Sequence, residues 1–258
     1  MTDRDPESPG KARRQQRDLV AGLRALILDG DVAPGEQLPS STELAAEYAV
    51  NAMSISRALT VLEAEGLVDR RRGRGVFATD RGPMVVRASH YPRTTGSDEP
   101  YGWITDPNRH RVPSSRILKV GETPAPRPVA AVFGIERGTP VVMRHQLLLL
   151  DDEPAELVWS YYTAEIARGT ALAGSRAIKG GSPRVLAELG FPPRNAKDKV
   201  GVRMATRSEY AALRLPADIP VLRQFRVVFT DDHRPVEATV LVKAGQQYEV
   251  EYDLPESS

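Results

Sequence analysis

The sequence predicts an α+β chain of two domains: a helical N-terminal domain ending in a basic hairpin, and a larger C-terminal domain with a mostly antiparallel sheet and helices. Three stretches within residues 18–65 carry apolar side chains at helical spacing. Glycines and prolines then interrupt residues 79–100, as in a linker. Seven strand-like runs follow, joined in places by turns too short for parallel crossovers. We therefore place the domains at 11–80 and 93–255, with a linker at 81–92.

Composition limits the class of protein. The 258 residues are 41% hydrophobic and 27% charged, which is typical of a globular protein with a substantial core. No apolar run approaches the roughly 18–20 residues of a membrane-spanning helix, and residues 1–10 do not resemble a secretory signal. We expect a cytoplasmic protein without membrane contact. The absence of cysteine excludes disulfides, and the four histidines lack metal-ligand spacing, so no metal or cofactor is expected.

Local signals define the ends of the first three helices. Residues 18–29 form an apolar stripe and are followed by glycine. Ser40 is placed to cap a second helix, with Glu43 returning the bond in a capping box. Asn51 is a suitable cap for a third helix that continues to Glu65. The spacing predicts a helix, a tight turn and a further helix.

The third helix has two unlike faces. Its apolar face, which must pack on the other helices, consists of Ile55, Ala58, Leu59 and Leu62. The opposite face is small, polar and cationic, and consists of Met53, Ser56, Arg57 and Thr60. Such a face can approach a polyanion, and after a helix and a tight turn it is typical of a recognition helix in the DNA major groove.

A basic hairpin is predicted to follow that helix. Residues 67–79 read as two short strands around an Arg-Gly-Arg-Gly turn, where glycine permits unusual backbone angles. The net charge is only +1, but basic residues gather at 11–17 and 70–74. Arginines on such a wing bind phosphates or enter the minor groove. The alternative is an ordinary surface hairpin with solvated charges.

Residues 15–78 resemble the DNA-binding domain of the GntR family. The resemblance lies in the Pro-Gly-Glu-x-Leu-Pro turn, Glu-Leu-Ala, Arg-Ala-Leu-x-x-Leu-x-x-x-Gly-Leu and the Gly-Arg-Gly wing. Family members commonly carry arginine where this chain has Ala52 and Ser56, so the operator sequence does not follow from the resemblance. The helix pattern and the resemblance together assign DNA contacts to Ser41, Thr42, Ala52, Met53, Ser54, Ser56, Arg57, Thr60, Arg71, Arg72, Gly73 and Arg74.

The C-terminal domain contains an internal repeat. Residues 140–156 resemble residues 220–237, and each copy is a predicted hairpin with Asp-Asp at its bend. Each copy places a glutamate two residues beyond a proline, Glu156 in the first and Glu237 in the second. If the hairpins are related by approximate symmetry within one sheet, both carboxylates point toward a shared cleft.

Strand alternation adds polar candidates to these glutamates. Three sets each share a face: Glu156 with Ser160 and Tyr162, Arg144 with Gln146, and Glu237 with Thr239 and Lys243. One interpretation is a pocket lined by a cation, carboxylates and hydroxyls. The other is a half-exposed sheet whose polar residues face solvent.

Residues 114–254 are similar to the effector-sensing domain of the HutC subfamily of GntR regulators, which resembles the chorismate lyase fold. The similarity is strongest in GIERGTPVVMRHQLLLLDDEPAELVWSYY and RPVEATVLVKAGQQYEVEYDLP. Gln146 stands where subfamily members that bind phosphorylated sugars tend to have a second basic residue, so such a sugar is only weakly indicated. The resemblance and the strand pattern assign effector contacts to Ser89, His90, Tyr91, Arg144, Gln146, Glu156, Ser160, Tyr162, Ser182, Glu237 and Lys243.

The expected function is a homodimeric repressor. Its partners are double-stranded operator DNA with an inverted repeat and a small-molecule effector that releases it. The competing class is a chorismate-lyase-like enzyme with an accessory DNA-binding module, since fold likeness alone does not determine function. The sequence shows no nucleophile elbow, metal cluster or phosphate-binding glycine loop, and it is too short for the aminotransferase-like domain that would bind pyridoxal phosphate. We therefore expect a regulator and not an enzyme.

Overall fold

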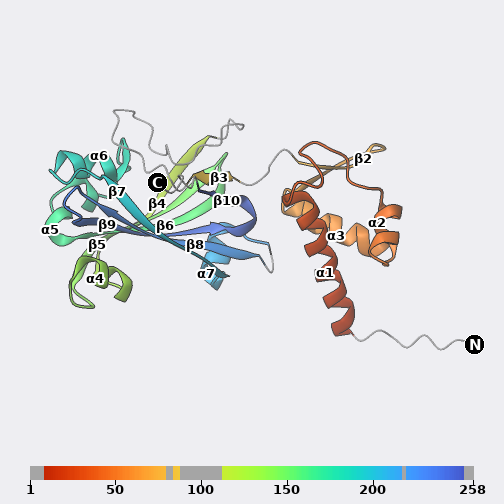
Figure 1. Cartoon of the computed structure of the whole chain (residues 1–258), viewed down its shortest axis with the longest axis horizontal. Coiled ribbons are helices and arrows are strands. Elements are labelled where there is room, and N and C mark those ends of the chain that lie inside the picture. Colours follow the sequence, from red (N-terminus) through yellow and green to blue (C-terminus); the bar gives the residue numbers. More distant parts are fainter. Residues whose placement is uncertain (1–8, 80–83, 88–111, 217–218, 253–258) are drawn as a thin grey trace, which may run out of the picture. The chain divides into compact units, whose positions relative to one another are not determined.

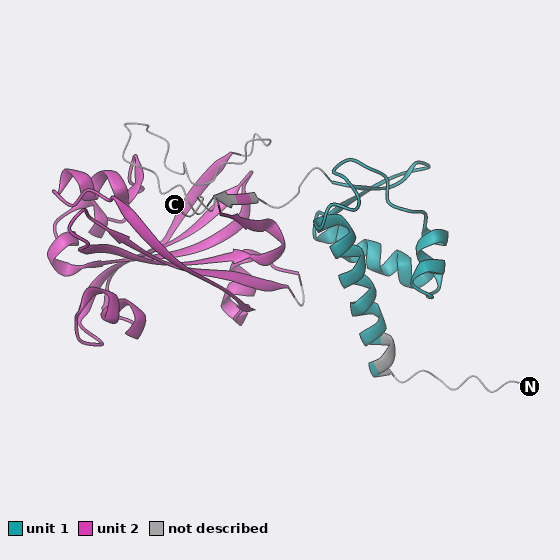
Figure 2. Ribbon diagram, viewed as in Figure 1, with its two compact units in different colours: residues 1–83 teal, residues 84–258 magenta. Residues whose placement is uncertain are grey.

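The structure is a computed structural model that describes residues 9–79, 84–87, 112–216 and 219–252. The chain forms two compact units, residues 1–83 and residues 84–258, coloured separately in Figure 2. The order of elements, three helices and a hairpin followed by a sheet with short helices, can be followed in Figure 1. The predicted fold class is confirmed. Among the described residues, no helix combines the length and apolar character needed to cross a membrane.

The first unit has three helices and a two-stranded hairpin. Its elements are α1 (Pro9–Leu28), α2 (Ser41–Glu47), α3 (Ala52–Ala64), β1 (Val68–Arg71) and β2 (Gly75–Ala78). The two strands are antiparallel, with Val68 opposite Ala78. The helices bury Leu23, Leu44, Ile55 and Leu62 in one core, which fixes the side of α3 that faces inward.

The predicted caps set the ends of α2 and α3. Ser40 Oγ accepts a hydrogen bond from the Glu43 amide, and Glu43 Oε2 accepts one from the Ser40 amide at 2.7 Å. Asn51 Oδ1 accepts from the Ser54 amide at 2.9 Å. Between the helices, Ala49 adopts a left-handed conformation with φ 52°. The tight turn therefore relies on a strained residue between two well-capped helices.

The second unit is built on a six-stranded antiparallel sheet. Its strands are β4 (Pro113–Pro124), β5 (Pro140–Leu150), β6 (Glu153–Thr163), β7 (Asn195–Met204), β8 (Pro220–Phe229) and β9 (Pro235–Ala244). They lie in the order β4-β5-β6-β9-β8-β7. The two repeated hairpins, β5–β6 and β8–β9, therefore meet at the centre of the sheet, where β6 pairs with β9.

Short helices cover the two faces of the sheet, and Figure 1 shows α4 and α7 on the side opposite α6. These elements are α4 (Arg127–Phe133), α5 (Ala164–Ala167), the 3-10 helix η1 (Ala171–Ala173), α6 (Gly181–Glu188) and α7 (Arg207–Leu213). α5 and η1 follow each other closely in the chain but are separate elements. Arg168 is extended and Gly169 has φ 74°, which ends α5. α5, η1 and α6 pack over one end of the sheet around Tyr162.

One parallel pair was not predicted. β3 (Met84–Arg87) lies within the segment taken as a linker, and it pairs in parallel with β10 (Tyr248–Glu251). β10 follows β9 through a 3-10 helix, η2 (Gly245–Gln247). Tyr248 packs with Leu150 and Ala155, so this small sheet is anchored to the main one.

Candidate functional site

The third helix presents its polar face outward. Met53 is 64% exposed, and Ser56, Arg57 and Thr60 are also exposed. Ser54 is half-buried, and its hydroxyl donates a hydrogen bond to the capping Asn51 at 3.1 Å. The other residues predicted to contact DNA before and within the helix, which are Ser41, Thr42 and Ala52, are exposed. The surface needed for a groove contact is therefore present.

The hairpin turn presents the predicted wing. Arg71, Arg72, Gly73 and Arg74 are all exposed, and Gly73 has φ 71°. The Arg74 amide donates to the Arg71 carbonyl at 2.9 Å, closing the turn. The Arg71 guanidinium lies 4.4 Å from the centre of the Phe77 ring, which holds this side chain along its own hairpin. Arg72 and Arg74 occupy the tip itself.

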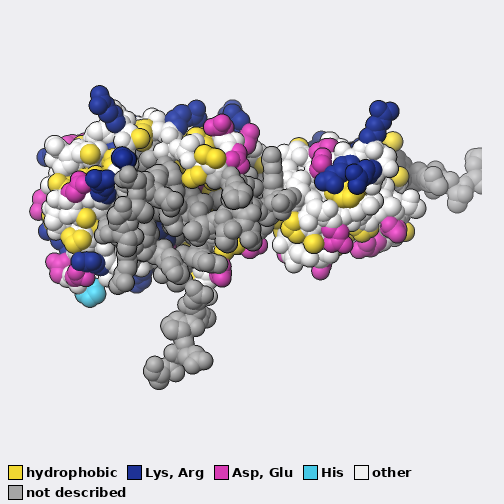
Figure 3. All heavy atoms as spheres, turned by 90° about the horizontal axis from the view of Figure 1, so that it is seen from above, with side chains coloured by type: hydrophobic (Ala, Val, Ile, Leu, Met, Phe, Trp, Pro, Cys, Tyr) yellow, Lys and Arg dark blue, Asp and Glu magenta, His cyan; other side chains and the backbone are white. Residues whose placement is uncertain are grey.

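Arg70, a residue absent from the predicted contacts, joins the hairpin to the helix. Its Nη2 donates to the Ser56 carbonyl at 2.9 Å and to the Thr60 hydroxyl at 2.8 Å. Its Nε lies 3.1 Å from Glu63 Oε2. The base of the wing and the outward face of α3 therefore lie side by side. Figure 3 shows Lys and Arg side chains gathered on one part of the first unit's visible face.

A cavity of about 450 Å³ lies against the other unit's sheet. Of the predicted effector contacts, the structure brings together Arg144, Gln146, Ser160, Tyr162, Ser182 and Glu237. Apolar lining comes from Pro113, Leu148, Val158, Ile178, Pro183, Val228 and Leu241. Ser89, His90 and Tyr91 lie outside the described residues. A volume of this size suits a small organic molecule.

Glu156 and Lys243 do not reach this cavity. They share its face of the sheet but sit opposite each other further along β6 and β9, where Lys243 Nζ lies 2.6 Å from Glu156 Oε2. The two side chains are only 1% and 0% exposed. Burial lowers the pKa of Lys243, and the adjacent carboxylate of Glu156 opposes that shift. The approximate symmetry of the hairpins thus brings only Glu237 into the cavity.

Arg144 holds a loop at the cavity wall. Its Nη1 donates to the carbonyls of Ala171, Leu172 and Gly174, and its Nη2 donates to that of Arg176 at 2.9 Å. Burial lowers the pKa of Arg144, while Tyr162 and Glu237 favour its charged form. Because four carbonyls surround the guanidinium, it fixes the segment that leads into α6.

Glu237 is the centre of a hydroxyl network. The side chain of Ser182 donates to Oε2 at 2.9 Å, and that of Thr239 donates to Oε1 at 2.7 Å. Ser160 Oγ lies 3.1 Å from Thr239 Oγ1. Burial, together with the charge of Glu237, raises the pKa of Tyr162 well above its ordinary value, so the phenol is neutral.

Sequence reasoning missed Arg226, which also lines the cavity. Its Nε and Nη2 donate to Asp198 at 2.8 and 2.7 Å, and Gln224 donates to the same carboxylate at 2.7 Å. The repeat contained the signal, because Arg226 corresponds to Gln146 when the two copies are aligned. Within the described residues, no group of three or more His, Cys, Asp or Glu side chains is placed to hold a metal ion.

Comparison with known proteins agrees with both units. Residues 15–78 match bacterial regulatory proteins of the gntR family, and residues 108–249 match the UTRA domain. The uncharacterized HTH-type transcriptional regulator SCO4628 of Streptomyces coelicolor is 28% identical over 256 residues, covering 94% of each chain. The HTH-type transcriptional repressor NagR of Bacillus subtilis is 24% identical, covering 89% of this chain and 90% of that one.

Structural comparison shows the same fold. The crystal structure of PhnF from Mycobacterium smegmatis aligns with a TM-score of 0.59 at 19% identity, covering 93% of this chain and all of that one. A winged helix-turn-helix followed by a sheet domain, with a cavity lined by polar and apolar side chains, defines a DNA-binding transcription regulator with an effector domain. The chain belongs to the GntR family of bacterial regulators, in the HutC subfamily that carries a UTRA domain. The curated relatives named above are likewise transcriptional regulators.

Proposed function

We propose that this protein is a homodimeric repressor that binds an inverted repeat in its operator and dissociates when a small molecule fills the cavity of the second unit. The observation that carries the proposal is the exposed face of α3 with Arg57 and Thr60, flanked by the wing at Arg72. The helix would read base edges in the major groove, and the wing would bind phosphates.

A dimer with two-fold symmetry suits a protein that carries one recognition helix per chain. Two copies related by a dyad match two half-sites about one helical turn apart, which multiplies the specificity of one helix. NagR of Bacillus subtilis is a transcriptional repressor, which supports repression, and not activation, by this chain. Such a protein acts in the cytoplasm, where the chromosome lies.

Release by an effector requires that the ligand favour one arrangement of the protein over another. A ligand that bound both the DNA-competent and the DNA-free arrangement equally would leave operator affinity unchanged. The cavity supports this proposal, since Arg144 binds the loop before α6 and Ser182 of α6 bonds Glu237 in the cavity wall.

The test is a gel shift of the purified full chain with the intergenic DNA beside its own gene. A discrete complex at moderate salt, competed by the same sequence and not by scrambled DNA, is expected. Size-exclusion chromatography with light scattering should give the mass of two chains. A band that scrambled DNA removes equally well would contradict sequence-specific regulation, and a monomer on DNA would contradict the dimer.

A further inference from the structure

The hydroxyl protons of Thr239, Ser182 and Ser160 are already used in hydrogen bonds. Thr239 and Ser182 each donate their single proton to the carboxylate, at 2.7 and 2.9 Å. Since the proton of Thr239 is used, Ser160 must be the donor in the 3.1 Å contact between their hydroxyls. These three hydroxyls therefore offer lone pairs to the cavity and no protons.

The strong donors of the cavity are committed as well. Arg144 directs Nη1 and Nη2 to four main-chain carbonyls, and Arg226 directs Nε and Nη2 to Asp198. Lys179 also lines the cavity, but the residue is exposed, so solvent screens its charge. Gln146 and Tyr162 are neutral. An anionic ligand buried there would therefore meet only neutral donors, unless it displaced the hydrogen bonds of the two arginines.

Glu237, unlike the two arginines, still has hydrogen-bonding positions available. Its side chain belongs to a residue only 7% exposed, and two hydroxyls occupy two of the roughly four acceptor positions of its carboxylate. The ion pairs of the described residues do not include it. Its hydrogen bonds come from neutral hydroxyls, and the nearby Arg144 guanidinium, whose charged form Glu237 favours, donates to carbonyls instead. A charged N–H group of a ligand would add a shorter and stronger, charge-assisted hydrogen bond to this carboxylate.

We propose that the cavity takes a ligand whose buried end is a nitrogen cation with two or more N–H groups, an ammonium or amidinium, seated on Glu237. The remainder of the ligand is apolar, because Leu148, Val158 and Leu241 line the same cavity. A hydroxyl would supply one proton and no charge, and a phosphate would supply acceptors only. This inference rests on the proposed function, since it names the ligand class of the proposed effector site.

The experiment uses four probes with one phenyl-alkyl skeleton on the full-length protein: 2-phenylethylamine, 2-phenylethanol, 3-phenylpropanoate and 2-phenylethyl phosphate. Isothermal titration and thermal unfolding should rank the amine first, with affinity about tenfold or more above that of the alcohol, as expected for a charge-assisted bond. The two anions should bind more weakly still. An anion in first place, an alcohol equal to the amine, or no detectable amine binding at millimolar concentration would overturn the inference.

Glu237→Gln keeps the shape of the side chain and removes its charge. This variant should lose the preference for the amine over the alcohol, by about tenfold. Glu188→Gln is the matched control, since Glu188 is an exposed carboxylate at the other end of α6, paired with Arg184. The control should keep the wild-type ranking, and a preference that survives in Glu237→Gln would overturn the inference. If Glu237→Gln does not fold, the wild-type ranking decides the question.

The experiments distinguish a failure of the ligand inference from a failure of the proposed function. Failure of the wild-type chain to shift its operator would contradict the regulator and leave the ranking of probes intact. A ranking headed by an anion would overturn the cationic ligand and leave the operator complex intact. Amine binding that does not alter the operator complex would support the ligand class and show that this probe binds the DNA-competent and DNA-free arrangements equally.

Discussion

Arg70 on β1 and Thr60 on α3 are joined by a hydrogen bond of 2.8 Å from the guanidinium Nη2 to the hydroxyl oxygen. The same nitrogen donates to the main-chain carbonyl of Ser56, and Nε faces Glu63 at 3.1 Å. One side chain thus connects the hairpin to three successive turns of the helix, which fixes the spacing between the two parts of the proposed DNA-binding surface.

Arg70→Ala should weaken operator binding about three- to tenfold, because the helix and wing lose a tie of roughly 1 kcal/mol at an exposed position. Fluorescence anisotropy with labelled operator measures the change. Arg207→Ala is the control, since Arg207 is an exposed arginine at the start of α7 in the other unit. Equal affinity of Arg70→Ala and wild type would show that the tie has no part in binding.

Arg57 and Arg72 should contribute differently to DNA binding, Arg57 to sequence discrimination and Arg72 to affinity for all sequences. Arg57→Ala should reduce discrimination between operator and mutated operators by about 1–3 kcal/mol, because Arg57 lies on the exposed face of α3. Arg72→Ala should lower affinity for all sequences and reduce the salt slope by about one ion, as expected for a phosphate contact. Titrations at several salt concentrations separate the two effects. Identical behaviour of the two variants would contradict the assigned roles.

Removing one partner of the buried ion pair between Lys243 and Glu156 should lower the free energy of unfolding strongly, whereas replacing both with apolar residues should lower it little. Glu156→Gln leaves the 1% exposed ammonium without its carboxylate, and the free energy of unfolding should fall by about 3–5 kcal/mol. The double variant Glu156→Leu with Lys243→Met should recover most of that loss, because neither charge remains buried. Urea denaturation gives both values. A double variant as unstable as the single one would show that the pair is required for packing.

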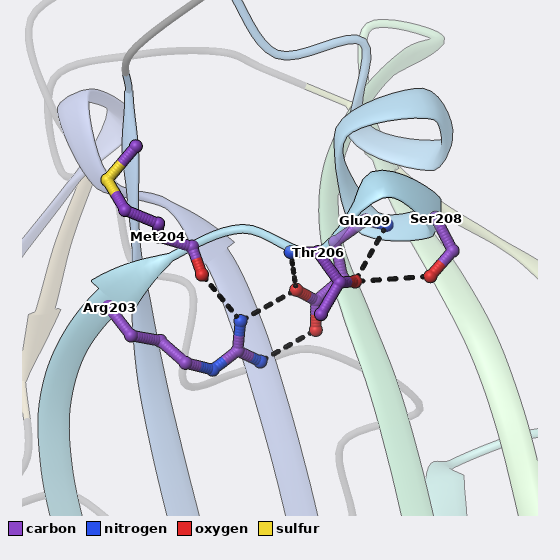
Figure 4. Close-up of polar contacts among 5 residues, drawn as sticks. All are labelled: Arg203, Met204, Thr206, Ser208 and Glu209. Carbon is purple, nitrogen blue, oxygen red and sulfur yellow. Dashed lines mark hydrogen bonds and ion pairs between the residues drawn. The ribbon is translucent and has the colours of Figure 1, made fainter.

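Glu209 should make unfolding depend on pH in the acid range. Figure 4 shows its carboxylate facing the Arg203 guanidinium, with both contacts at 2.7 Å, and the Thr206 amide donating to the same group. The Arg203 bonds are the main cause that lowers the pKa of Glu209 from 4.5 to about 2. Because the folded-state pKa is the lower one, the stabilisation is complete above about pH 4.5 and is lost as pH falls toward 2.

The size of this effect is limited by solvent, since the Arg203 side chain is 37% exposed. We expect roughly 1–2 kcal/mol between pH 6 and pH 3, measured by urea unfolding. Glu209→Gln should flatten that part of the profile. Glu188→Gln, which removes an exposed carboxylate, should leave the profile as it is. A wild-type profile that Glu209→Gln does not change would exclude this ion pair as its source.

The first unit could be predicted closely because its signals are local. The period of Ile55 and Leu62 defines the buried side of α3, and the caps at Ser40 and Asn51 depend on neighbours three residues away. The choice of Arg70 over the adjacent arginines could not be predicted. It depends on where β1 crosses α3, which is a matter of packing between elements.

The cavity could be predicted only in part. Alternation correctly places Glu156 and Glu237 on one face of the sheet, but it does not show how far along each strand the cavity extends. Arg144 was expected to bind the effector, and its described partners are carbonyls 27 to 32 residues away. Such contacts depend on the path of a loop, and a strand pattern carries no information about that path.

The parallel pairing of β3 with β10 brings the first described segment of the second unit beside the strand that follows the central sheet. Both segments are four residues long, and a two-stranded ladder of that length holds together only through its anchorage, here Tyr248 against Leu150 and Ala155. A protein engineer who removed β10 would therefore also detach the strand by which the chain enters this domain.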